Sequence, residues 1–110
     1  MIHDTIASLE TTLSRAPALK DSERTQLLEL LGRLKSEVGE LAKTNADQAH
    51  SIAGFAAVSA HEAIRAERDP KLLELSLSGL SHSVGRFEES HPHLVRVVNS
   101  ICSALANLGI

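Results

Sequence analysis

Histidine is the residue most suggestive of chemistry in this 110-residue chain, which contains six of them. Glu88 and His91 are three residues apart, the spacing at which metal-binding helical bundles present two ligands from one helix. A complete site of that kind needs further carboxylates on facing helices, and a second Glu-x-x-His is missing. Glu88 and His91 are therefore weak metal candidates, and the position of His91 directly before Pro92 favours helix capping.

Two further histidines, His50 and His61, are eleven residues apart in a segment that we expect to be helical. Their separation along a helix axis is about 16 Å, at 1.5 Å per residue, which is too far for one metal ion. A solvated polar face is the favoured interpretation. The alternative is an interface between two antiparallel copies of the helix, in which histidine charge would change near pH 6.5.

Nucleophilic and phosphate-binding motifs are not found. The chain has thirteen serines but no Gly-x-Ser-x-Gly sequence, and its six glycines are isolated from one another. Its single cysteine, Cys102, lies among Val98, Ile101 and Leu105, which is typical of a small buried apolar residue in a reducing compartment. We therefore expect no enzymatic activity, no catalytic residue and no cofactor.

The composition restricts the classes of partner. Apolar residues make up 43 % and charged residues 23 % of the chain, and the formal net charge is -3. Nucleic-acid binding is not expected, because a basic stripe and aromatic stacking platforms are lacking. No apolar run approaches the roughly 20 residues that cross a bilayer, so no membrane partner is expected. The first residues do not resemble a secretory signal, which predicts a cytoplasmic protein.

Apolar residues that recur at alternating spacings of three and four predict helices. The core must be aliphatic, because the chain has no Trp or Tyr and two Phe. The pattern predicts one all-α domain over residues 1–110, an antiparallel bundle of four longer helices and a short N-terminal helix. The predicted stripes are Ile2, Ile6, Leu9 and Leu13; Leu27, Leu31, Leu34, Val38 and Leu41; Ala49, Ala53, Ala56, Ala60 and Ala63; Leu73, Leu77, Leu80, Val84 and Phe87; Leu94, Val98, Ile101, Leu105 and Leu108.

Polar residues and prolines predict the helix boundaries. Asp21 and Asp69 are expected N-caps, and Pro70 follows Asp69 at the first helical position. The block 43–48 is polar but contains neither Gly nor Pro, so it predicts a turn less firmly. The alternative is one long helix from about residue 22 to residue 67, fusing the second and third helices in an oligomeric coiled-coil-like assembly.

The third and fifth helices carry more apolar surface than one small chain is expected to bury. Large apolar residues lie outside the alanine stripe of the third helix, and the fifth helix, which we expect to be central, is apolar nearly all round. A symmetric dimer or tetramer would complete the core. The residues expected at this interface are Ile52, Ala53, Phe55, Ala56, Val58 and Ala60.

The two ends of the sequence carry a family resemblance. The runs 87–94 and 105–110, together with the opening residues 1–6, resemble a family of small bacterial proteins catalogued as domain of unknown function 4404. The resemblance implies a small α-helical protein without an assigned activity, catalytic residue or cofactor.

Three functions are compatible with these observations. The favoured hypothesis is a non-enzymatic helical protein that self-associates and acts as an oligomeric interaction or scaffold module. A second hypothesis is an adaptor that binds a helix of another protein. The third is a carboxylate-histidine metal-binding bundle.

Overall fold

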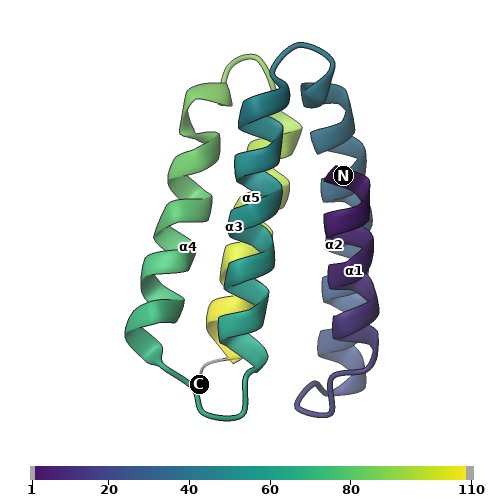
Figure 1. The fold of residues 1–110 in the computed structure, drawn as a ribbon, viewed down its shortest axis with the longest axis vertical. Helices are drawn as coiled ribbons and strands as arrows, with labels where there is room; N and C mark the ends of the chain where they lie inside the picture. The colour runs from purple at the N-terminus through teal and green to yellow at the C-terminus, as the bar shows by residue number, and fades with distance from the viewer. Residues whose placement is uncertain (1, 109–110) are drawn as a thin grey trace.

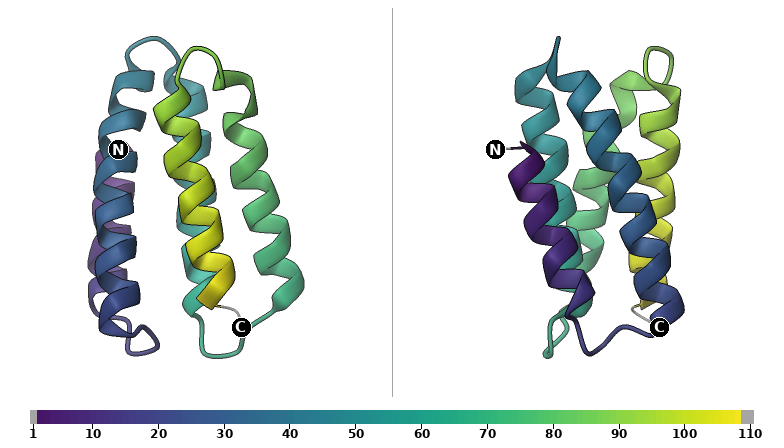
Figure 2. Two further views of the ribbon diagram at one scale, coloured as in Figure 1. Left: turned by 180° about the vertical axis from the view of Figure 1, so that it is seen from behind. Right: turned by 90° about the vertical axis from the view of Figure 1, so that its right-hand side faces the viewer.

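The computed structural model describes residues 2–108, which form a bundle of antiparallel α-helices (Figure 1). The order of elements is α1 (Ile2–Ser14), α2 (Asp21–Ala42), α3 (Ala46–Ile64), α4 (Pro70–Val84), the 3₁₀ helix η1 (Gly85–Phe87) and α5 (Pro92–Leu108). The predicted all-α fold, with four longer helices and a shorter first one, is confirmed. Each helix runs opposite to the preceding one, as the views from behind and from the side also show (Figure 2).

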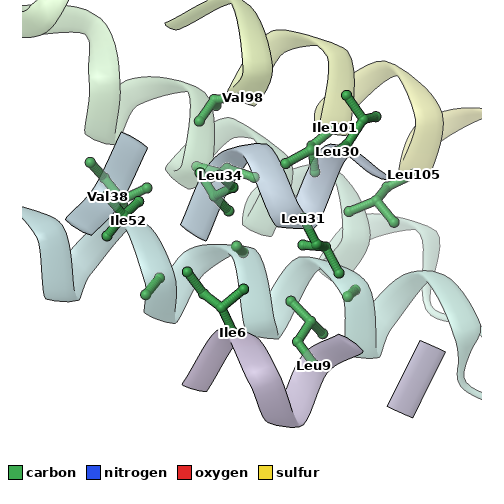
Figure 3. Packing of buried hydrophobic residues seen from close by; sticks show 14 of the residues in the cluster. Ile6, Leu9, Leu30, Leu31, Leu34, Val38, Ile52, Val98, Ile101 and Leu105 are labelled. Carbon is green, nitrogen blue, oxygen red and sulfur yellow. The ribbon is translucent and has the colours of Figure 1, made fainter. Parts of the chain in front are cut away.

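The predicted stripes form one continuous hydrophobic core (Figure 3). Leu34 and Leu80, central in their stripes, have no exposed surface. All five alanines of the α3 stripe are buried as well, and Leu77 and Leu108 are partly buried at its margin. A period of three and four residues places such side chains on one side of a helix, and here that side faces the bundle interior.

The central helix is α3, which packs against α1, α2, α4 and α5. We expected α5 in that place, and this prediction is wrong. α5 buries Leu94, Val98 and Ile101 but exposes His93, Arg96, Ser100 and Ser103 to solvent. The physical reason is side-chain size, because the short alanine side chains of α3 let neighbouring helices approach it from several directions.

The chain breaks between α2 and α3, so the alternative of one long helix is wrong. Lys43, Thr44 and Asn45 lie outside both helices. The Lys43 N–H donates to the Glu40 carbonyl over 3.2 Å, and the Asn45 N–H donates to the Leu41 carbonyl over 2.8 Å. These bonds satisfy the last carbonyls of α2 with ordinary negative φ angles, which explains why the turn needs no glycine.

The prediction that Asp69 caps α4 is confirmed. One carboxylate oxygen of Asp69 accepts hydrogen bonds from the backbone N–H groups of Lys71 and Leu72, each over 3.1 Å. This satisfies two of the N–H groups that a helix start leaves unpaired. Pro70, which has no N–H to satisfy, occupies the first helical position.

The prediction that Asp21 caps α2 is wrong. Lys20 is the cap residue, and its N–H donates to Glu23 Oε1 over 2.9 Å. Asp21 is already the first helical residue, where its carboxylate forms an ion pair with Arg24 over 2.9 Å. Glu23 reaches back to the cap residue, as in the second half of a capping box, and the helix therefore begins one residue earlier than the sequence suggested.

Candidate functional site

The weak metal candidates lie between η1 and α5. Glu88 is exposed, whereas the His91 ring lies edge-on to Phe87 with 5.7 Å between ring centres. Nδ1 of His91 is 3.1 Å from the Ser90 hydroxyl oxygen, and its carbonyl accepts the Val95 N–H at the start of α5. Residues 2–108 contain no group of three His, Cys, Asp or Glu side chains that could hold a metal ion. The geometry thus gives Glu88 and His91 no third ligand.

The other residues considered for chemistry lie apart from one another. His50 and His61 are exposed on α3, and His61 borders a hollow beside the hydroxyls of Thr5, Ser8 and Thr12 on α1. Cys102 is half-buried, and its thiol donates weakly to the Leu77 carbonyl over 3.8 Å. Burial raises the pKa of the Cys102 thiol, which lowers the fraction of reactive thiolate.

The residues predicted at a chain-chain interface divide into two groups. Ile52, Ala53, Ala56 and Ala60 are at most 2 % exposed, because other helices of the same chain cover them. For these four residues the prediction is wrong, since a second chain cannot reach them in this fold. They were misassigned because the sequence pattern alone does not show how many neighbours α3 has within its own chain.

The remaining two predicted residues, Phe55 and Val58, are 40 % and 51 % exposed. They lie beside two residues of α4 that the sequence analysis missed, Leu72 and Leu75, which are 43 % and 54 % exposed. A signal existed, because Leu72 and Leu75 fall outside the predicted stripe of the same helix. Within residues 2–108, these four are the large hydrophobic residues with exposed side chains, and all belong to α3 and α4.

We call this surface the apolar face and define it as Phe55, Val58, Leu72 and Leu75. The four side chains surround a shallow hollow of about 260 Å³. Glu62 and Ser76 also line it, one from each helix. α3 and α4 run antiparallel here (Figure 1) and form the most extensive helix pair in the bundle. The apolar face has two residues on each of these helices.

The charged groups at one end of the apolar face are paired within the chain. Glu62, only 8 % exposed, accepts a hydrogen bond from Arg65 over 2.9 Å. On α4, Lys71 lies 3.6 Å from Glu74. Each pair joins one acid and one base, so this end of the face is close to neutral although the whole chain has a net charge of -3.

Buried polar groups also gather in these two helices. The described part of the chain has three buried polar or charged residues, and all lie in α3 or α4: Ser59, Glu62 and Ser76. The Ser76 hydroxyl donates to the Leu73 carbonyl over 2.9 Å, but the Ser59 hydroxyl has no hydrogen-bond partner within residues 2–108. The α3–α4 pair thus carries both the buried polar side chains and the exposed large apolar side chains of the described residues.

Comparison with known proteins identifies a family but no characterised relative. No curated protein and no solved structure matches the chain. None of the described helices has the length and apolar character needed to cross a membrane. The sequence model of a family described as a domain of unknown function, DUF4404, matches residues 27–110. The match begins within α2, so the opening residues that also suggested the resemblance lie outside it. Because the matched segment is more than half of the chain, this protein belongs to the DUF4404 family.

Proposed function

We propose that this protein is a non-enzymatic helical module that self-associates through the apolar face and acts as an oligomeric interaction or scaffold protein. The observation that supports the proposal is the concentration of exposed large hydrophobic side chains on one face, made by α3 and α4. Scattered single apolar residues are common on protein surfaces, but a contiguous apolar patch around a hollow is typical of an interaction site.

Burial of the apolar face supplies the driving force for association. Removing apolar surface from water is worth about 25 cal/mol per Å². In a two-fold dimer the same face is used by both chains, so each side chain contributes twice. A standard interface buries roughly 800 Å² per partner, so polar neighbours of the apolar face, such as the exposed Ser51 and His82, would form its rim.

Charge favours a second copy of this chain as the occupant. Two acidic faces would repel each other, but the ion pairs Glu62–Arg65 and Lys71–Glu74 leave this face nearly neutral. Two copies can therefore meet here without the repulsion that the net charge of -3 implies elsewhere. The charges of these two ion pairs already neutralise each other, so they do not attract a strongly basic or strongly acidic partner.

The test is the concentration dependence of the mass of the full chain by sedimentation velocity. We expect a dimer or larger oligomer in the micromolar range, and we expect Val58→Asp and Leu75→Asp to shift it towards monomer. Both side chains are more than half exposed, so neither change should unfold the chain. Ala7→Asp, at an exposed position of α1, is the matched control and should leave the mass unchanged.

Two results would contradict the proposal. A monomer throughout the micromolar range would exclude self-association, and stoichiometric capture of a helix from another protein would then favour the adaptor hypothesis. An oligomer that both aspartate variants leave intact would show that the chains meet at a different surface.

A further inference from the structure

The Phe55 ring lies against α4 at the one position where that helix has a glycine. A methyl group on Gly79 would place its carbon 2.7 Å from Cδ1 and 3.1 Å from Cζ of Phe55, and closer still to Cε1. Carbon atoms in van der Waals contact are about 3.5–4.0 Å apart. Alanine at position 79 would therefore force the ring to move.

The backbone does not require glycine at position 79. Gly79 lies inside α4, and no described glycine has a positive φ angle. Glycine in a helix interior is less favourable than alanine, since it loses more conformational freedom on folding. The structural use of Gly79 is thus the space that it leaves for the Phe55 ring.

We infer that Gly79 is a positioning residue for self-association: it lets the Phe55 ring approach α4 closely and so shapes the apolar face that a second copy contacts. This inference rests on the proposed function. Phe55 borders the hollow together with Val58 and Leu75, so displacement of its ring changes the shape of the surface that must fit the second copy. The ring is 40 % exposed and can turn outward, which lets the fold tolerate the change while the interface does not.

The experiment measures association and stability separately for Gly79→Ala. We expect the dissociation constant of the oligomer to rise by at least about tenfold, as for loss of an aromatic anchor. In protein dilute enough to be monomeric, we expect the midpoint of thermal unfolding to stay unchanged or to rise, because alanine favours the helix. A residue with a purely structural role would instead lower the unfolding midpoint and leave association unchanged.

Gly32→Ala is the matched control. Gly32 lies inside α2, and a methyl group there would meet no atom within 4 Å apart from its two chain neighbours and the backbone of its own helix. This variant should raise the unfolding midpoint, because alanine favours a helix more than glycine does. The dissociation constant of its oligomer should equal that of the unaltered protein.

A second variant makes the test independent of the folding of Gly79→Ala. Phe55→Ala should weaken association by a similar factor, and adding Gly79→Ala to it should cause no further loss, because the displaced ring is gone. If the unaltered protein associates but Gly79→Ala or Phe55→Ala binds equally well, the inference is wrong and the proposed function stands. If the unaltered protein is monomeric, the proposed function fails and this inference with it.

Discussion

Two neighbouring helices, α2 and α3, differ in what they bury. α2 buries large side chains and presents charged residues to solvent. α3 buries mainly alanines and exposes Phe55 and Val58. The buried residues of α2 are Leu27, Leu30, Leu31, Leu34, Val38 and Leu41, whereas those of α3 are Ala49, Ile52, Ala53, Ala56, Ser59, Ala60, Glu62 and Ala63.

This difference follows from the position of α3 among four neighbours. Small side chains allow several helices to pack closely around one axis, but the same closeness leaves little room for a phenylalanine or valine between them. Ile52 is buried, but Phe55 and Val58 lie at the outer edge of the contact of α3 with α4. The comparison teaches that α2 serves mainly the stability of the fold, whereas α3 also carries exposed apolar residues, on which the proposed association depends.

The largest expected effect tests the α2 side of the comparison. Leu34→Ala should lower the free energy of unfolding by about 2–5 kcal/mol, because the fully buried side chain leaves a cavity. Chemical denaturation measures this change. Glu40→Ala, at an exposed position of the same helix, should have little effect, and equal midpoints for the two variants would show that α2 does not supply the core as described.

Overpacking tests the α3 side. Ala56 is 1 % exposed, so Ala56→Leu should destabilise the fold by about 1–3 kcal/mol as the surrounding helices are forced apart. Ala106→Leu, at an exposed position of α5, adds the same atoms and should be nearly neutral. If both variants unfold at the same denaturant concentration, α3 is not closely packed.

The same residue type can be compared directly in the two helices. Val38 of α2 is fully buried and Val58 of α3 is 51 % exposed. Val38→Ala should cost about 2 kcal/mol of stability, whereas Val58→Ala should cost well under about 1 kcal/mol. Urea unfolding of dilute protein, in which association does not contribute, measures both changes. Equal losses in the free energy of unfolding would remove the distinction between the helices.

A smaller effect is expected at the two helix starts. Asp69→Ala should cost about 1 kcal/mol, because it removes the acceptor for two N–H groups at the start of α4, the main partner of α3. Asp21→Ala removes an exposed ion pair with Arg24 and should cost clearly less. A larger loss in thermal stability for Asp21→Ala would restore Asp21 as the cap of α2.

The smallest effect concerns the contact of α5 with α4. Because burial raises the pKa of the Cys102 thiol, the folded chain keeps this proton to a higher pH than the unfolded chain does. Its contribution to stability is therefore complete below the unfolded pKa of about 8.5 and is lost as the pH rises through the folded pKa. The free energy of unfolding, measured between the unfolded and the folded pKa of this thiol, should fall more steeply with pH for the unaltered protein than for Cys102→Ser.

The helices and their buried stripes were predictable from the sequence because both depend on local spacing. Side chains three and four residues apart share one side of a helix whatever that helix packs against. The N-cap at Asp69 was predictable for a similar reason, since its acceptor lies two and three residues from the N–H groups that it binds. The prediction for Asp21 failed because the Glu23 carboxylate pairs with the backbone N–H of Lys20, which becomes the cap residue in place of Asp21.

The candidate site was predictable only in part. Phe55 and Val58 were recognised as surplus apolar residues, but Leu72 and Leu75 were not, although both fall outside the predicted stripe of their helix. Spacing along one helix does not show which surplus leucines the neighbouring helices cover. The proximity of Gly79 to Phe55 joins positions 24 residues apart in the chain, and no local pattern indicates it.

The sequence by itself determined that the chain is helical, where its helices begin and end to within a few residues, and that its core is aliphatic. Only the tertiary structure decided that α3 rather than α5 is central, that the alanine stripe is covered within one chain, and that four apolar side chains remain outside. The physical reason is that spacing along a helix reports which side is apolar, whereas the size and number of neighbours decide how much of that side is buried. One chain completes its own core, and the question of a partner concerns the apolar face alone.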